Sequence, residues 1–114
     1  MNYDEYIKEL EKYDSDETVK RLIHHLKDWK SSEDDVLKLE GMVEHFFGNS
    51  WIESTEIHNK LYQLWASFKK EAIDPIGGHT MNERLYWFGL FEQFDRCKNE
   101  TEKQIIYAKL QAST

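Results

Sequence analysis

Cysteine and long apolar runs are the two features that this sequence most clearly lacks. Cys97 is the only cysteine, which excludes an internal disulfide and a multi-cysteine zinc site and favours a reducing environment. The longest stretches without Asp, Glu, Lys or Arg, such as residues 61–68, reach 8 residues, whereas a membrane-spanning helix needs about 20. Residues 1–8 also lack the basic start and apolar run of a signal peptide. We therefore expect a cytoplasmic protein with no membrane segment.

Positive charge is scarce as well. The chain carries 15 Lys and Arg against 22 Asp and Glu, a net charge of −7. Because binding to nucleic acid requires a basic surface that neutralises phosphates, this balance disfavours nucleic acid as a partner. The only close basic pairs, Lys20–Arg21 and Lys69–Lys70, lie in helical segments that also carry acids.

Motifs for metal binding and catalysis are also missing. None of the five histidines belongs to a His-Glu-x-x-His or Glu-x-x-His pattern, which are the spacings of zincins and of ferritin-like di-iron proteins. Cys97 falls in phase with Leu90 and Phe94 on an apolar helix stripe, where a buried thiol is inert. Acids are numerous, but no pair is singled out for acid–base work. We predict no catalytic residue, no metal site and no cofactor.

Helical periodicity is what the sequence does contain. Apolar residues spaced three and four apart predict a helix over about 2–13, a second one containing residues 19–29 and a third with an apolar face over 36–47. Cap residues at 14–16 and 31–35 open the second and third helices, and Gly48–Asn49 closes the third. A fourth helix has its stripe over 57–72. It begins either at Ser50, which has capping-box spacing to Glu53, or at Ser54 or Thr55.

Residues 81–98 are expected to form the central helix of the fold. Large apolar side chains between Leu85 and Phe91 cover nearly its whole circumference, as in a helix surrounded by others. They are interpreted as core, with a partner-binding surface as the alternative. Thr80 and Glu83 have capping-box spacing at its start, and Asn99 and Glu102 repeat that spacing before a last helix. The fold class is therefore all-α, a compact bundle of five or six helices with short loops, and residues 1–114 form a single helical domain.

The negative charge is confined to the first half of the chain. Residues 1–54 hold 7 Lys and Arg against 14 Asp and Glu, whereas residues 55–114 hold 8 against 8. The acids concentrate at expected helix beginnings, at residues 4–5, 14–17 and 33–35. Helix capping and the helix dipole alone would favour acids there. The functional alternative is that these helix beginnings lie together on an acidic face that steers a basic partner.

The first functional hypothesis is a non-catalytic interaction protein that binds a basic protein partner. In size, acidity and lack of a catalytic constellation, the chain resembles the small immunity proteins with which bacteria block their own toxins. Residues 31–39, Ser-Ser-Glu-Asp-Asp-Val-Leu-Lys-Leu, also resemble a helix start in colicin-nuclease immunity proteins. The paired-tyrosine region that follows in those proteins has no counterpart here. An inhibitor of this kind would work by occlusion, through the acidic residues Glu33, Asp34, Asp35, Glu40 and Glu44.

The second hypothesis is a small anionic-ligand-binding or enzymatic helical domain that uses the segment from Gly77 to Arg84. Gly77 and Gly78 would allow the backbone to approach a ligand, and the following helix start would offer free amides and a positive dipole end. His79 and Arg84 could add charge, with His79 handling protons near neutral pH. A tight turn before a well-capped helix is the structural alternative. A homodimer with the aromatic residues at its interface also remains open.

Overall fold

The computed structural model describes residues 1–52 and 54–112, and all regular structure in this part of the chain is helical. The all-α prediction is therefore confirmed. The elements are α1 (Tyr3–Glu11), α2 (Glu17–Ser31), α3 (Val36–Asn49), α4 (Thr55–Ala72), a single 3₁₀ turn η1 (Ile76–Gly78), α5 (Met81–Phe88), α6 (Phe91–Asp95) and α7 (Glu100–Lys109).

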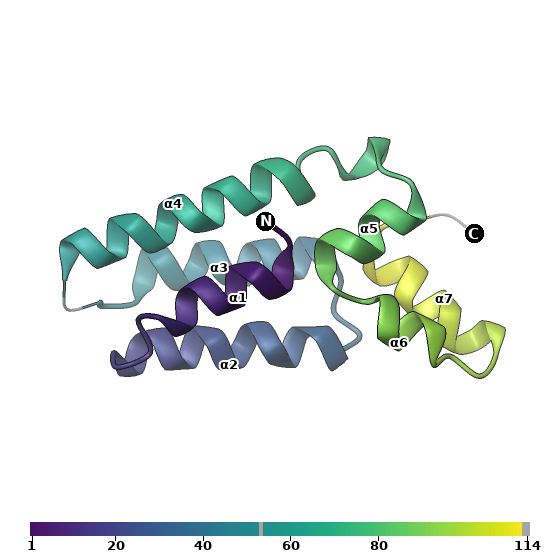
Figure 1. The fold of residues 1–114 in the computed structure, drawn as a ribbon, viewed down its shortest axis with the longest axis horizontal. Helices are drawn as coiled ribbons and strands as arrows, with labels where there is room; N and C mark the ends of the chain where they lie inside the picture. The colour runs from purple at the N-terminus through teal and green to yellow at the C-terminus, as the bar shows by residue number, and fades with distance from the viewer. Residues whose placement is uncertain (53, 113–114) are drawn as a thin grey trace.

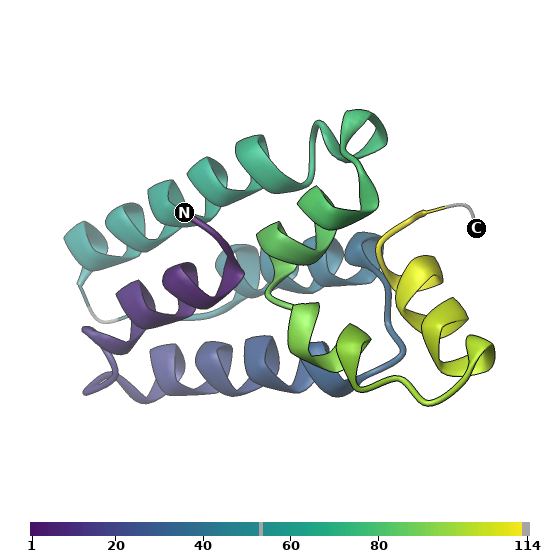
Figure 2. The same ribbon diagram turned by 45° about the vertical axis from the view of Figure 1, so that its right-hand side comes forward.

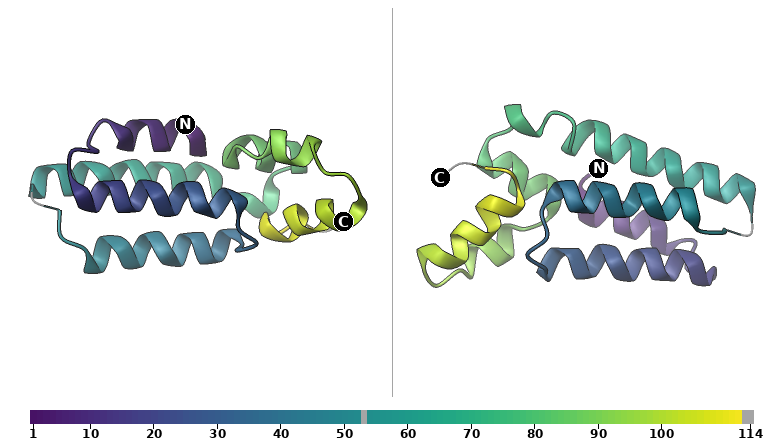
Figure 3. Two further views of the ribbon diagram at one scale, coloured as in Figure 1. Left: turned by 90° about the horizontal axis from the view of Figure 1, so that it is seen from below. Right: turned by 180° about the vertical axis from the view of Figure 1, so that it is seen from behind.

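The helices are arranged as a long bundle with a smaller group across one end. α2 and α3 run antiparallel to each other, as do α3 and α4. The shorter α1 packs between α2 and α4 (Figure 1). α5, α6 and α7 lie together at the end of the bundle where α2 ends and α3 begins (Figure 2). Seen from below, α5 lies in the same layer as α1 (Figure 3). The molecule measures 45 × 25 × 21 Å along its principal axes.

Tyr3 of α1 is the meeting point of the aromatic core. Its ring centroid lies 5.3 Å from that of Trp29 on α2, 5.7 Å from that of Phe68 on α4 and 6.3 Å from that of Phe88 on α5. One turn later, the Tyr6 ring stacks on Phe68 with centroids 5.6 Å apart and an interplanar angle of 10°. All of these side chains are buried, so the apolar stripe predicted for the first helix is the contact surface for three other helices.

The expected continuous helix over 81–98 is wrong, because the chain breaks at Gly89. This residue has a φ of +64° and ends α5 in the left-handed conformation. A Cβ built on Gly89 would lie 2.5 Å from a carboxylate oxygen of Asp4, so glycine is required both for the backbone conformation and for the close approach of α1. The aromatic residues are also not enclosed on all sides, since Tyr86 is 48% exposed. This break produces α5 and α6 where one helix was expected.

Most of the predicted caps are present. Thr80 and Glu83 form the expected capping box at α5. α4 is capped by Ser54, and Ser50 instead ends α3, so the earlier of the two proposed starts is wrong. The Glu53 of that alternative lies outside the described residues. Asn99 caps α7, although the Glu102 carboxylate accepts the amide of Lys98 instead of completing the box.

Tyr3 and Tyr6 provide a matched pair for testing the core. The Tyr3 hydroxyl donates a hydrogen bond of 2.7 Å to the Leu26 carbonyl, whereas no partner for the buried Tyr6 hydroxyl is found among the described residues. We expect Tyr3→Phe to lower the free energy of unfolding by about 1 kcal/mol. Tyr6→Phe should raise it by a similar amount, because it removes a buried hydroxyl that has lost its water partners. Urea denaturation of both variants tests this, and equal destabilisation by both would contradict it.

Candidate partner-binding surface

The three acidic helix beginnings do not form one face. Residues 14–17 lie at the start of α2 and residues 33–35 lie beyond its end, so the 15 residues of α2 separate them by about 22 Å at the usual helical rise of 1.5 Å per residue. Figure 1 shows these two segments at opposite ends of the bundle. Residues 4–5 lie at the same end of the bundle as residues 33–35, because the Asp4 carboxylate is 2.7 Å from the Nζ of Lys30 in the last turn of α2.

Glu33, Asp34 and Asp35 occupy the connection between α2 and α3. Asp35 caps α3, accepting the amide of Lys38 at 2.9 Å, and its other carboxylate oxygen accepts the side-chain amide of Gln111 at 2.8 Å. Glu33 and Asp34 are exposed, and Asp34 lies 3.6 Å from the Lys38 ammonium. Asp35 therefore holds the fold locally, whereas Glu33 and Asp34 present their carboxylates to solvent.

Glu40 and Glu44 belong to a different part of the surface. They lie one turn apart on α3 and face α4, where the Lys69 ammonium is 3.6 Å from Glu40 and 3.9 Å from Glu44. The Glu44 carboxylate also accepts the indole N–H of Trp65 at 3.0 Å. The pKa of Lys69 is raised chiefly by Glu40, with smaller contributions from Asp74 and Glu44. The five predicted partner-binding residues thus divide into the exposed pair Glu33 and Asp34, the structural cap Asp35, and the half-buried pair Glu40 and Glu44 against α4.

The segment 33–35 is held in place by Lys109, which sequence reasoning missed. Its side chain is 2% exposed, and its ammonium donates to the backbone carbonyls of Trp29, Ser32 and Asp34. It also lies 3.9 Å from the centroid of the Trp29 ring, a cation–π contact. Burial lowers the pKa of Lys109 to about 8, an effect that Asp34 and Asp35 partly oppose. One cation from α7 therefore binds the carbonyls where α2 ends and the connection to α3 begins.

The segment from Gly77 to Arg84 folds as η1 followed by the start of α5. Arg84 is buried, and its guanidinium donates to the backbone carbonyls of His79, Leu110 and Gln111 at 2.8–3.1 Å. The Glu83 carboxylate accepts the Thr80 amide, and the hydrogen bonds with Thr80 lower its pKa. The Thr80–Glu83 capping box and the guanidinium thus already have partners within the chain. Gly77 and Gly78 are exposed, and the His79 ring stacks on Trp87, although no partner for its buried Nδ1 is found among the described residues. This geometry favours a structural turn over an anion site.

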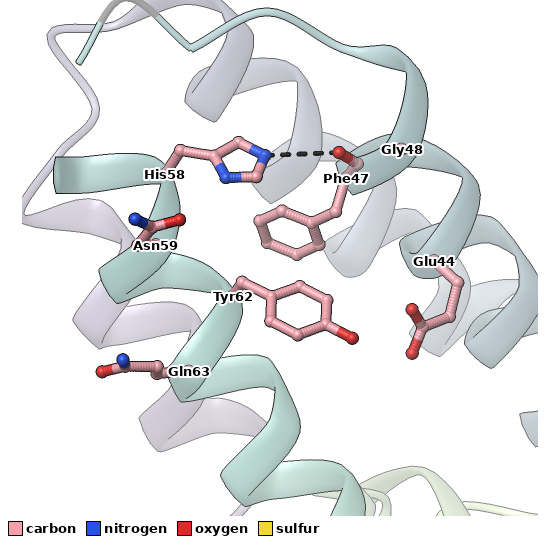
Figure 4. Close-up of a pocket in the computed structure, with 7 residues that line it drawn as sticks. All are labelled: Glu44, Phe47, Gly48, His58, Asn59, Tyr62 and Gln63. Carbon is pink, nitrogen blue, oxygen red and sulfur yellow. Dashed lines mark hydrogen bonds between the residues drawn. The ribbon is translucent and has the colours of Figure 1, made fainter. Parts of the chain in front are cut away.

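A cavity lies on the bundle surface, between the end of α3 and the start of α4. It has a volume of about 480 Å³, within the usual range of ligand sites. Figure 4 shows the His58 Nε2 pointing at the Phe47 carbonyl, 3.2 Å away, and the Tyr62 hydroxyl pointing toward Glu44. Because a carbonyl only accepts, this His58 nitrogen carries the proton and caps the end of α3. The cavity, termed below the α3–α4 groove, is lined by Glu44, Phe47, Gly48, His58, Asn59, Tyr62 and Gln63.

Sequence reasoning identified only Glu44 among the residues of the α3–α4 groove. Tyr62 and Gln63 fall outside the apolar stripe of α4 and therefore look like ordinary surface residues in the sequence. The one available signal was an aromatic residue, Tyr62, on the polar side of a helix, and the structure leaves it 41% exposed. The ring centroids of Tyr62 and Phe47 lie 5.4 Å apart at an angle of 90°, which places two aromatic side chains beside one carboxylate.

In the part of the chain that the structure describes, no group of three or more His, Cys, Asp or Glu side chains is arranged to hold a metal ion, and none of the helices has the length and hydrophobicity of a membrane span. The half-buried Cys97 lies 3.3 Å from the Gln93 carbonyl. No protein-family model, curated protein or solved structure matches the chain.

Lys109 gives a prediction with a defined dependence on pH. Lys109→Met should lower the free energy of unfolding by about 3 kcal/mol, because the Ser32 and Asp34 carbonyls lose their donor. Since the pKa of Lys109 falls from 10.5 to about 8 on folding, the unfolded chain binds more protons between these values. Wild-type stability should therefore rise relative to the variant from pH 8 to 10.5, by at most about 1.4 kcal/mol per pH unit.

Urea denaturation of both proteins at several pH values between 7 and 10 provides the measurement. The comparison cancels the titration of the tyrosines, which both proteins share. A stability difference that stays constant or shrinks with rising pH would show that Lys109 does not titrate as a buried cation.

Proposed function

We propose that this chain is a non-catalytic cytoplasmic interaction protein, an acidic inhibitor or immunity-type protein that binds a basic protein partner by occlusion. The observation that carries the proposal is the exposed pair Glu33 and Asp34 on a segment that hydrogen bonds tie to the rest of the fold. In this segment Lys109 binds the Asp34 carbonyl, the Asp35 carbonyl accepts the Trp29 indole N–H, and the Asp35 side chain caps the helix that follows. Because this segment is already fixed, little conformational entropy is lost there when a basic surface binds its carboxylates.

The distribution of charge supports the same proposal. Residues 1–54 account for the whole net charge of −7. Asp4 and Glu5 lie toward the same end of α2 as Glu33 and Asp34, so at least two of the acidic helix beginnings add to the field at that end. The acidic pair at residues 4–5 is only partly neutralised. Asp4 is paired with Lys30, whereas Glu5 accepts a hydrogen bond from the backbone amide of Asn2.

The test is affinity capture on the immobilised full chain at low salt, followed by rate measurements with each purified protein that is retained. A basic partner should associate more slowly as salt rises, because exposed charges are screened. Glu33→Gln combined with Asp34→Asn should reduce the association rate at low salt about fivefold and leave the dissociation rate nearly unchanged.

Asp14→Asn combined with Glu17→Gln is the matched control. Both residues are exposed at the start of α2, at the opposite end of the bundle from residues 33–35, and their replacement changes the net charge by the same amount. Equal slowing by the two double variants would indicate a non-specific effect of net charge. Binding that is insensitive both to salt and to Glu33 and Asp34 would refute the proposal.

A further inference from the structure

We propose that the α3–α4 groove is the subsite that receives an arginine side chain of the basic partner. This inference rests on the proposed function and specifies where one partner residue binds. The groove combines an exposed tyrosine ring, a half-buried carboxylate and a cavity of about 480 Å³. These are the components that bind a planar cation, which stacks on the ring and donates hydrogen bonds to the carboxylate.

Tyr62 provides the surface on which a guanidinium would stack. Its ring is 41% exposed, and an edge contact with Phe47 at 5.4 Å fixes its orientation. Phe47 is buried and is packed in turn by the His58 ring at 5.6 Å. The tyrosine ring is therefore held by neighbours before a ligand arrives, so little side-chain entropy is lost when a cation binds.

Glu44 provides the charge. Its Oε1 accepts the Trp65 indole N–H at 3.0 Å and is 3.9 Å from the Lys69 ammonium. A carboxylate can accept about four hydrogen bonds, so capacity remains for a second donor. Lys69 lies closer to Glu40, at 3.6 Å, and one ammonium cannot neutralise two carboxylates. The pair Glu40 and Glu44 with Lys69 therefore keeps one negative charge beside the tyrosine, in a half-buried site where screening is reduced.

Arginine fits this arrangement better than lysine. A guanidinium is planar and weakly hydrated, so it stacks on an aromatic face while its N–H groups reach a carboxylate. The Tyr62 hydroxyl points toward Glu44 (Figure 4), so the ring and the carboxylate line the same groove. The exposed amides of Asn59 and Gln63 on α4 offer carbonyl oxygens at the rim for further donors.

The direct test uses N-acetyl-arginine amide as the probe, with the corresponding lysine and citrulline amides as controls. Backbone amide shifts of the full chain are followed by NMR during each titration. Arginine amide should shift signals of Tyr62 and Gln63 with a dissociation constant in the millimolar range, and lysine amide should bind several-fold more weakly. Citrulline amide has nearly the same shape but no charge, and should bind at least tenfold more weakly.

Two pairs of substitutions separate binding from folding. Gly48 lines the groove, and a Cβ there meets no atom within 4 Å, so Gly48→Met adds a side chain at the groove lining without a clash at its Cβ. Gly41→Met is the matched control, because Gly41 lies on α3 in equally open space and does not line the groove. Tyr62→Leu is likewise matched by Tyr86→Leu on α5. In each pair only the groove variant should weaken arginine binding, by fivefold or more.

The two proposals fail in different ways. Arginine amide that binds no better than citrulline amide, or equally well to Gly48→Met and Gly41→Met, would overturn the arginine subsite. The capture and rate measurements on Glu33 and Asp34 would then still decide the proposed function. If a basic partner is captured and Tyr62→Leu leaves its dissociation rate unchanged, the partner binds elsewhere and the arginine subsite is again wrong.

Discussion

The position of the acidic segment depends on one buried cation. Lys109 comes from the last turn of α7, yet its ammonium binds the carbonyls at the end of α2 and in the connection to α3. Helix ends leave carbonyls without partners, and these are costly to bury. Lys109, in the neutral half of the chain (residues 55–114), thus supplies the donor for carbonyls in the acidic half (residues 1–54). Arg84 completes the connection by binding the carbonyls of Leu110 and Gln111 beyond α7.

The aromatic core joins the two halves in a second way. Tyr3 contacts rings on α2, α4 and α5, so the short first helix is part of every major packing interface around it. The break at Gly89 belongs to the same arrangement, because it lets the Asp4 side chain approach the chain between α5 and α6. Asp4 in turn pairs with Lys30 at the end of α2. The acidic residues of α1 are therefore positioned by packing as well as by capping.

The sequence was sufficient to predict the helical class, most caps and the buried stripes, because these depend on local spacing and on the solvation of short segments. It could not predict Lys109 or Arg84 as buried donors, since their partners lie at residues 29–34 and 110–111 and become neighbours only in the fold. The same reason explains why Glu44 could be predicted as a site residue and Tyr62 could not. The charge of an acidic residue is evident from the sequence alone, whereas the groove forms only when α3 and α4 pack side by side.

The division of the predicted acids clarifies how a partner would be recognised. In the proposed interaction, exposed carboxylates such as Glu33 and Asp34 would act over a distance and be weakened by salt, so they would govern the rate of encounter. Glu44 is half-buried beside two aromatic rings, where water competes less and a bound cation would dissociate slowly. Fast attraction at one end of α3 and a fixed subsite at the other would make affinity depend on both ends of the same helix. A partner would then need a basic surface long enough to reach along α3, with an arginine at one end of it.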